Sequence, residues 1–248
     1  MGVRRAATDM SVIRILTANL CNGQADPAAL IDLIEHLQVD VVCVQELRPR
    51  LAKPISQVLA HGQLGAHPYH RELGIACRYE AEVKQFPLPR RPGWVARLSP
   101  AHWPQLHSPI EIVNVHIMAP HMRPYARSLS LRRGQLAGLL HFLAQEPDVP
   151  RAILGDFNAS PLWPLYRRLA SRFTDAATAV VHKTKRPRPT WPHIPALRLN
   201  GLFRIDHCFL SRLSASRVEV IPISGSDHLG LYVEVMQFRN MLNHGNID

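Results

Sequence analysis

The sequence contains few cysteines and no paired cysteine motif. It has neither a CxxC nor an HExxH pattern, and its four cysteines stand singly in apolar surroundings, at Cys21, Cys43, Cys77 and Cys208. This argues against a structural zinc site and against a disulfide framework. Single cysteines within or beside expected strands are usually buried free thiols, so we expect a reducing, cytoplasmic environment.

Long apolar runs, internal repeats and low-complexity segments are also missing. No stretch approaches the roughly 20 apolar residues that a membrane-spanning helix needs, and residues 1–10 lack the apolar core of a signal peptide. A chain of 248 residues with 46% hydrophobic content can bury a sizeable core in one domain. We expect that domain over residues 10–238, with flexible tails at 1–9 and 239–248, in a monomeric protein.

Acidic residues are in the minority. The chain has 19 Asp and Glu against 29 Lys and Arg, which gives a formal net charge of +10. Such a balance favours anionic partners, namely nucleic acid, an anionic lipid surface or a polyphosphorylated small molecule. We expect the Arg pairs at 90–91, 132–133 and 167–168 on exposed helix and loop faces.

The richest basic cluster lies in a Pro-rich loop just before Trp191. Its members are Lys183, Lys185, Arg186 and Arg188. Cations beside an aromatic ring suit phosphate contact and base stacking at the rim of a substrate site. The alternative, which the sequence leaves open, is a solvated basic loop with Trp191 packed on the core.

Apolar runs and helical periodicity alternate along the chain, as expected for a mixed α/β domain. Strands are expected at 13–18, 39–44, 74–78, 93–98, 110–117, 152–154, 204–210, 218–221 and 229–235. Helices are expected from Asp26-Pro27 to about 37, over 51–60 and 127–145, and from near Ser160-Pro161. The helix over 127–145 is predicted to turn Leu129, Leu136, Leu139, Leu140 and Leu143 inward.

Polar side chains follow several of these expected strands. They are Asn19, Glu46, Asn114, His116, Asp156, Asn158, Asp206, Asp227 and His228. Polar groups at strand ends can converge at one edge of a sheet, which is the geometry of a catalytic pocket. An oxygen-rich set of this kind suits a hard divalent cation, Mg²⁺ or Mn²⁺, rather than zinc.

The motifs that contain these residues occur in a characteristic order. They are Thr17-Ala18-Asn19, Gln45-Glu46, Asn114-Val115-His116, Gly155-Asp156-Phe157-Asn158, Ile205-Asp206-His207 and Ser226-Asp227-His228. Over nearly the whole chain, this series resembles the endonuclease/exonuclease/phosphatase superfamily of DNase I-like, metal-dependent phosphoesterases. The resemblance implies an α/β (α+β) fold, a four-layer α/β/β/α sandwich of two packed mixed β-sheets flanked by helices, with the active site at one end of the sheet pair.

The resemblance also implies a metal site and its ligands. Glu46 is the expected principal ligand of Mg²⁺ or Mn²⁺, with Asn19 and Asp227 beside it. For Asn19, an ordinary turn role remains the alternative. Asn114 points to the same strand face as His116 and is expected to help orient the substrate.

Catalytic roles follow from the same resemblance. Asp156 would orient or deprotonate the attacking water, and Asn158 would donate a hydrogen bond to a phosphoryl oxygen. His116 would contact the scissile phosphate or protonate the leaving oxygen, with Glu72 as a possible partner. His228 would be held by Asp206, while His207 should be structural. Whether Asp156 or His228 is the general base stays open.

The chain departs from the abasic-site endonucleases at two places. Asn19 is followed by Leu20 and Cys21, without the expected Arg, and His116 stands where that branch carries Tyr. The leading hypothesis is therefore a general nucleic-acid phosphodiesterase, either an endonuclease or an exonuclease. Alternatives are a phospholipid or sphingomyelin phosphodiesterase, for which we find neither an apolar hairpin nor an anchor, and a phosphatase of inositol-phosphate-like metabolites. A non-catalytic nucleic-acid-binding module is disfavoured because the catalytic residues are present.

Overall fold

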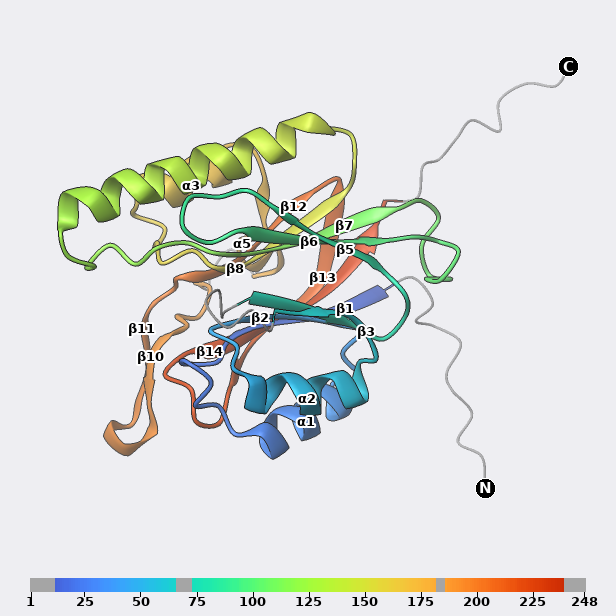
Figure 1. Ribbon diagram of the computed structural model, residues 1–248, viewed down its shortest axis with the longest axis horizontal. Coiled ribbons are helices and arrows are strands. Elements are labelled where there is room, and N and C mark those ends of the chain that lie inside the picture. Colours follow the sequence, from blue (N-terminus) through green and yellow to red (C-terminus); the bar gives the residue numbers. More distant parts are fainter. Residues whose placement is uncertain (1–11, 66–72, 182–185, 239–248) are drawn as a thin grey trace, which may run out of the picture.

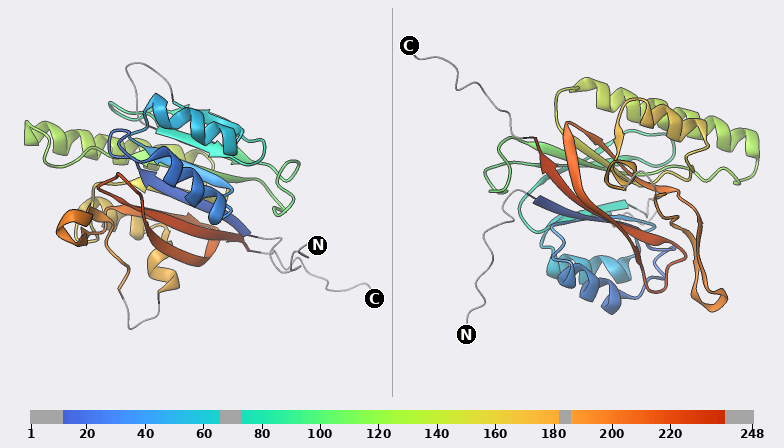
Figure 2. Two further views of the ribbon diagram at one scale, coloured as in Figure 1. Left: turned by 90° about the horizontal axis from the view of Figure 1, so that it is seen from below. Right: turned by 180° about the vertical axis from the view of Figure 1, so that it is seen from behind.

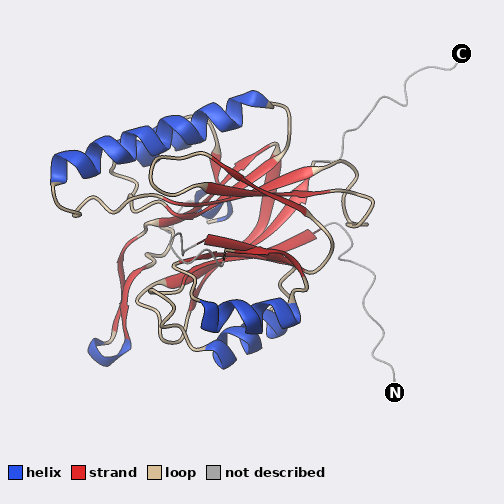
Figure 3. Cartoon of the chain, viewed as in Figure 1, coloured by secondary structure: helices blue, strands red, loops and turns tan. Residues whose placement is uncertain are grey.

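Two six-stranded sheets packed face to face, with helices on both outer faces, form the protein (Figures 1 and 3). The computed structural model describes residues 12–65, 73–181 and 186–238. The expected tails, Glu72, Lys183 and Lys185 lie outside the described residues. The four-layer α/β/β/α arrangement and the DNase I-like architecture implied by the motif series are confirmed.

The first sheet carries the N-terminal motifs. Its order is β13 (Leu213–Pro222), β14 (Leu229–Gln237), β1 (Val12–Asn19), β2 (Val41–Gln45), β4 (Leu73–Cys77) and β3 (His61–Leu64). Only β1 and β2 pair in parallel within it. Its outer face is covered by α1 (Pro27–His36) and α2 (Pro49–Val58), and α1 begins where the Asp26 carboxylate caps the Ala29 amide at 3.1 Å.

The second sheet carries the central motifs. Its order is β5 (Glu82–Phe86), β6 (Gly93–Leu98), β7 (Ile110–His116), β8 (Arg151–Asp156), β12 (Asp206–Ser211) and β9 (Thr174–Asp175). Here β7 and β8 are the parallel pair. The outer face is covered by α3 (Tyr125–Gln145) and α4 (Pro164–Ala170), while α5 (Ala176–Val180) contacts β12 and β13.

Three apolar cores hold the layers together. In β1, Ile13 and Ile15 face the core between the sheets, and Leu16 and Ala18 face α1. Because both faces of the central strands are buried, their sequences read as continuous apolar runs. The three cysteines of the central strands, Cys43, Cys77 and Cys208, are buried free thiols, as expected.

Helix α3 buries most of the leucine face that the sequence predicts, together with polar residues. Leu129 is 40% exposed, and the buried residues are Ser128, Arg132, Gln135, Leu139 and Leu143. The expectation is right for Leu139 and Leu143 and for Leu136 and Leu140, which pack half-buried against the same core, and it is wrong for Leu129. The placement of Arg132 on an exposed face is also wrong. The first half of the helix buries polar groups because they hydrogen-bond loops around the cleft described below.

A two-stranded ribbon projects from the sandwich (Figures 1 and 2). It consists of β10 (Trp191–Ile194), a 3-10 turn (Pro195–Leu197) and β11 (Leu199–Phe203). Leu197 and Leu202 on it are 72% and 64% exposed. The expectation that the chain has no apolar hairpin is corrected by this ribbon. In the described part of the chain, no helix is long and apolar enough to cross a membrane.

Candidate active site

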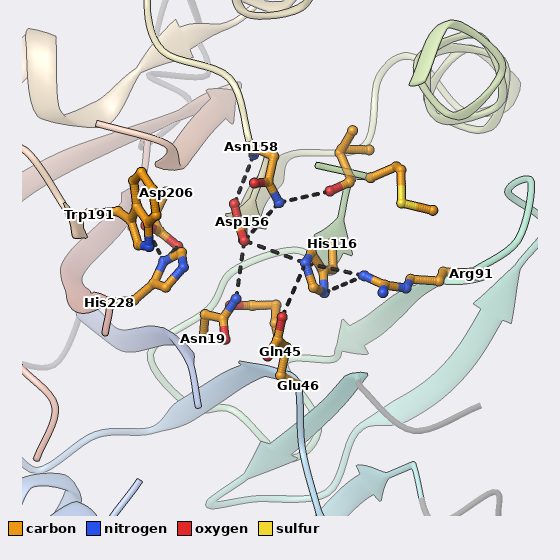
Figure 4. A network of polar contacts seen from close by, with 12 residues as sticks. Asn19, Gln45, Glu46, Arg91, His116, Asp156, Asn158, Trp191, Asp206 and His228 are labelled. Carbon is orange, nitrogen blue, oxygen red and sulfur yellow. Dashed lines mark hydrogen bonds and ion pairs between the residues drawn. The ribbon is translucent and has the colours of Figure 1, made fainter. Parts of the chain in front are cut away.

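A cleft of about 530 Å³ opens at one end of the sheet pair. Many of the residues singled out from the sequence line it, and Figure 4 shows most of them together. They are Asn19, Glu46, His116, Asp156, Asn158, Trp191, Asp227 and His228. Both sheets contribute, so the strand ends converge on one site as the motif series predicts.

Strand register places three of the polar residues in a row. His116 and Asp156 are paired positions of parallel β7 and β8, and Asp206 is paired with Asp156 across antiparallel β8 and β12. Asp206 is the first residue of β12, whereas His116 and Asp156 are the last residues of their strands. Because β12 is antiparallel to β8, all three lie at the same edge of the sheet. Gly155 allows the close approach: its φ is +134°, and a Cβ atom would lie 1.9 Å from the Val115 carbonyl oxygen.

Asp156 is the centre of the hydrogen-bond network. Its Oδ1 accepts from the Asn158 amide at 2.8 Å, and its Oδ2 accepts from the side chains of Asn158 and Asn19 at 3.0 and 3.1 Å. The Asn158 side chain also donates to the Ile117 carbonyl at 3.0 Å. Both of its donor hydrogens are thus used within the protein, so Asn158 here orients Asp156 instead of facing a phosphoryl oxygen.

Burial raises the proton affinity of Asp156. Burial raises the pKa of this carboxyl to about 7, and the negative charge of Asp206 adds to the rise. The positive charge of His228 and the hydrogen bonds from Asn158 and Asn19 act in the opposite direction. A carboxylate with a pKa near neutrality can receive a proton under physiological conditions.

His228 is the positive pole of the site. Its Nδ1 lies 3.0 Å from Oδ2 of Asp206, and both side chains are buried. Burial disfavours the imidazolium, but the charge and hydrogen bond of Asp206, with the charges of Asp156 and Asp227, outweigh it and raise the pKa of His228 to about 10. His228 is therefore protonated at neutral pH, and its counter-ion is the residue implied by the family resemblance.

Thr190 fixes Asp206 and is a positioning residue that the sequence did not reveal. Its buried Oγ1 accepts from the backbone amides of Ile205 and Asp206 at 3.1 and 3.2 Å. The sequence around Thr190 does not indicate this role, because the two amides that its hydroxyl binds belong to a segment about fifteen residues later.

His116 has a cationic neighbour. Nη1 of Arg91 lies 2.9 Å from its Nδ1 and 3.2 Å from its Nε2, and Oδ2 of Asp156 lies 3.4 Å from Nε2. Burial, and then the charges of Arg91 and His228, lower the pKa of His116 well below its usual value. A neutral His116 can donate one hydrogen bond, but it is a poor proton donor to a leaving group. Arg91 was expected on an exposed face, which is wrong, since it lines the cleft.

The donor set fits a hard divalent cation. Oε2 of Glu46 accepts from the Asn22 amide at 2.6 Å, and its Oε1 points towards His116 at 3.9 Å, with about a third of the side chain exposed. In the described part of the chain, ligand atoms of Asp156, Asp206 and His228 also lie within 4.8 Å of one another. Asp206 and His228 are already bonded to each other, so Glu46 is the carboxylate best able to accept a cation.

Other residues of the expected metal site have partners in the cleft wall. Asn19 donates to Asp156, and its Oδ1 accepts from the Cys21 amide at 3.0 Å. Oδ2 of Asp227 accepts from the Trp191 indole at 3.0 Å. Trp191 therefore lies at the cleft, as expected if its ring stands at the rim of the substrate site.

Three expected substrate-binding residues lie away from the cleft. Asn114 is fully buried between the sheets, where it donates to the carbonyls of Val44 and Gly74 and accepts from Gln45 at 2.7 Å. Its side chain is a structural link, and this corrects its assignment to substrate. Arg186 and Arg188 are exposed beside β13, where Arg188 donates to the Val220 carbonyl at 3.4 Å.

One cleft residue, Trp163, and one buried residue behind it, Arg132, went unrecognised in the sequence. Trp163 lines the cleft from the segment before α4, and the Arg132 guanidinium lies 5.2 Å from its ring centre. Arg132 donates to the carbonyls of Met118 and Asn158, and so ties two cleft loops to α3. Arg132 lies on the same buried face of α3 as Gln135 and Leu139. A search for periodic hydrophobic residues does not detect buried polar residues on such a face.

Comparison with known proteins bears on this geometry. A sequence model described as Endonuclease/Exonuclease/phosphatase family matches residues 16–228. None of the curated protein sequences matches the chain. A family protein of that description from Bacteroides thetaiotaomicron superposes with a TM-score of 0.73 at 15% identity, covering 92% of this chain and 98% of its own.

Two further solved structures have functional names. A mannosyl-6-phosphatase of Bacteroides thetaiotaomicron has a TM-score of 0.72 at 16% identity, with 90% of this chain and 99% of its own covered. TDP2 of D. rerio, complexed with a single strand DNA product, has a TM-score of 0.69 at 16% identity, with 91% and 99% covered. At such identities the likeness establishes the fold.

Proposed function

This chain belongs to the endonuclease/exonuclease/phosphatase family of metal-dependent phosphoric ester hydrolases, and we propose that it hydrolyses phosphodiester bonds of nucleic acid with Mg²⁺ or Mn²⁺. The observation that carries the proposal is the meeting of Glu46, Asp156 and His228 in one cleft. A phosphodiester is an anion with a poor leaving group, so its hydrolysis needs charge neutralisation, an oriented water and a proton donor.

The proposed metal ligands are Glu46, with Asn19 and Asp227 on the same cleft wall. A divalent cation held there neutralises phosphate charge and polarises the phosphoryl group. Asp156, whose pKa lies near 7, receives the proton of the attacking water. His228, protonated beside Asp206, faces the same space and donates to the departing oxygen. Asn158 holds Asp156 in position, and His116 beside Asp156 contacts the phosphate.

The rest of the cleft supports a nucleic-acid substrate. Trp163, Trp191 and Phe203 present aromatic rings on its walls, and Arg90 and Arg91 add positive charge. Aromatic platforms stack bases without regard to sequence, and basic residues follow the phosphate backbone. The DNA-bound TDP2 structure shows that this fold accommodates a nucleic-acid strand.

A substrate panel tests the proposal. Wild-type protein is assayed with Mg²⁺ and Mn²⁺ on DNA, RNA, phospholipid and a phosphomonoester. We expect nucleic-acid cleavage that falls roughly 100-fold or more in Glu46→Gln and in His228→Ala. Glu35→Gln is the matched control, because Glu35 is an exposed glutamate on α1. Equal cleavage by wild type and Glu46→Gln, or monoester hydrolysis alone, rejects the proposal.

A second candidate function rests on the projecting β10–β11 ribbon. Leu197 and Leu202 stand in solvent on it, and Phe203 at its base is 49% exposed and lines the cleft. An exposed apolar projection next to an active site suits a lipid surface, so a phospholipid phosphodiesterase is the alternative. Two results would support the phospholipid phosphodiesterase. The protein should co-sediment with anionic liposomes and lose this binding in a Leu197→Asp and Leu202→Asp double variant, and it should turn over phospholipid in the substrate panel.

A further inference from the structure

A strained turn between β5 and β6 brings two arginines to the cleft. The Arg91 amide donates to the Pro89 carbonyl at 2.9 Å, and Arg90 between them has φ of +71°. A three-residue turn with positive φ at its centre is rare, and a non-glycine residue is strained in that region. Such a turn persists only where the surrounding structure holds it.

Helix α3 holds this turn. The fully buried Gln135 donates to the Pro89 carbonyl at 3.1 Å and accepts from the Met118 amide at 2.9 Å. Gln135 thereby joins the turn to the loop that follows His116. The turn is therefore fixed by a hydrogen bond from a buried side-chain amide, that of Gln135, which a surface loop without a defined conformation would not require.

Two glycines of α3 make room for the segment before the turn. A Cβ atom at Gly134 would lie 3.2 Å from Pro89, and one at Gly138 would lie 2.9 Å from Leu88. Glycine in the middle of a helix is unfavourable relative to alanine. The close packing at both positions keeps the Pro-rich segment against the helix.

The result is a fixed position for the Arg91 guanidinium. It lies within 3.2 Å of both nitrogens of His116, and Figure 4 shows the imidazole ring between Arg91 and Asp156. His228 lies on the other side of Asp156 in the same view. The cleft therefore has a cation on each side of its central carboxylate, His228 on one side and Arg91 on the other.

From this geometry we infer that the Arg90-Arg91 turn is a second anion subsite, which binds a phosphate other than the one that is cleaved. The inference rests on the proposed nuclease function and specifies its substrate as a strand with a phosphate next to the scissile bond. A guanidinium can hold a phosphate through two parallel hydrogen bonds. Arg91 is half-buried, which strengthens such contacts relative to an exposed side chain.

The test compares matched dinucleotides. Dithymidine monophosphate is assayed without and with an added terminal phosphate, at the 3′ or the 5′ end, and kcat/KM is measured with Mg²⁺. The wild type should favour one phosphorylated form by roughly 10-fold or more, as expected for a charge-assisted hydrogen bond. Arg91→Gln should reduce this preference to about one, whereas Arg168→Gln, an exposed arginine on α4, should keep it.

Equal losses of both substrates in Arg91→Gln would place the guanidinium on the scissile phosphate and overturn the inference, as would an unchanged preference. Gln135→Met serves as a second variant, because it frees the turn without touching substrate. It should also lose the preference while its circular dichroism stays that of the wild type.

Failure of the proposed function has a separate readout. If no dinucleotide is cleaved, binding of thymidine 3′,5′-bisphosphate and of thymidine 5′-monophosphate is measured by calorimetry in EDTA. A tighter bisphosphate complex, with the difference abolished in Arg91→Gln and kept in Arg168→Gln, supports the subsite without turnover. Equal affinities for the two nucleotides in the wild type overturn it.

Discussion

Asp206 accepts a hydrogen bond from Nδ1 of His228 at 3.0 Å, and neither residue is more than 6% exposed. The pair joins the two sheets, since Asp206 begins β12 and His228 immediately precedes β14. A buried imidazolium is stable only beside a counter-charge, so the charge state of His228 depends mainly on Asp206, with Asp156 and Asp227 contributing less.

Replacing that carboxylate should change the protonation of His228. In Asp206→Asn, the carboxylate that opposes burial most strongly is lost, and the pKa of His228 should fall well below its wild-type value of about 10. Activity at pH 7 should drop roughly 100-fold or more, the usual contribution of a positioned acid. NMR titration of the His228 ring in metal-free protein measures the pKa, and an unshifted titration would contradict this account.

His207 should make the protein sensitive to acid. Burial and the charge of Arg204 lower its pKa to about 4, and Nε2 donates to the Ala159 carbonyl at 2.7 Å. The unfolded chain binds this proton near pH 6.5, so the stabilisation by neutral His207 is complete above pH 6.5 and is lost as the pH falls towards 4. The loss amounts to roughly 3 kcal/mol of unfolding free energy.

The matched variant is His207→Gln, which keeps a donor near the position of Nε2 but does not titrate. Urea unfolding at several pH values between 7 and 4 should show a flatter dependence than in the wild type. His36→Gln, at an exposed position on α1, should retain the wild-type slope. If His207→Gln keeps that slope too, the neutral state of His207 does not govern acid stability.

Thr190 should matter for both stability and activity. Thr190→Val keeps the shape but removes the acceptor of two buried amides, at about 1–3 kcal/mol for each unsatisfied group. Thr190→Ser keeps the hydroxyl and should unfold at a higher urea concentration than the valine variant. Because Asp206 would also be displaced, kcat should fall further in Thr190→Val than in Thr190→Ser. The reverse order would exclude the positioning role.

Metal binding should be visible without turnover. Mg²⁺ at about 100 times its Kd should stabilise the native protein by about 2.7 kcal/mol, which corresponds to roughly 5–10 °C in Tm. Glu46→Gln should lose most of this shift, and Glu35→Gln should keep it. A full shift in Glu46→Gln would move the metal to the neighbouring group of Asp156, Asp206 and His228.

The sequence predicted the long central strands and the residues at their ends. Apolar runs mark β1, β2, β7 and β8, and the parallel register of β7 and β8 brings His116 beside Asp156. The short edge strands went unnoticed because their residues are polar: β3 reads HGQL and β5 reads EVKQF. At a sheet edge, backbone pairing determines the strand, and hydrophobic alternation carries little information.

The cleft residues supplied by connections could not be predicted in the same way. Arg91 stands in a Pro-rich segment, and its role depends on a turn that Gln135 stabilises from a different part of the chain. Arg132, buried on α3 behind the cleft, likewise acts through the carbonyls of distant loops. Such relationships arise from tertiary contacts, whereas strand-end motifs are encoded by neighbours in the sequence.

The buried contact between Gln45 and Asn114 has a mechanical consequence. Their side chains meet at 2.7 Å, and Asn114 also donates to two carbonyls of the opposite sheet. These hydrogen bonds join the two sheets close to the cleft. They therefore fix the distance between the site residues of the first sheet and those of the second sheet. Slight separation of the two sheets would abolish turnover while every helix and strand survived. In rising denaturant, catalysis should therefore fail before the circular dichroism signal does.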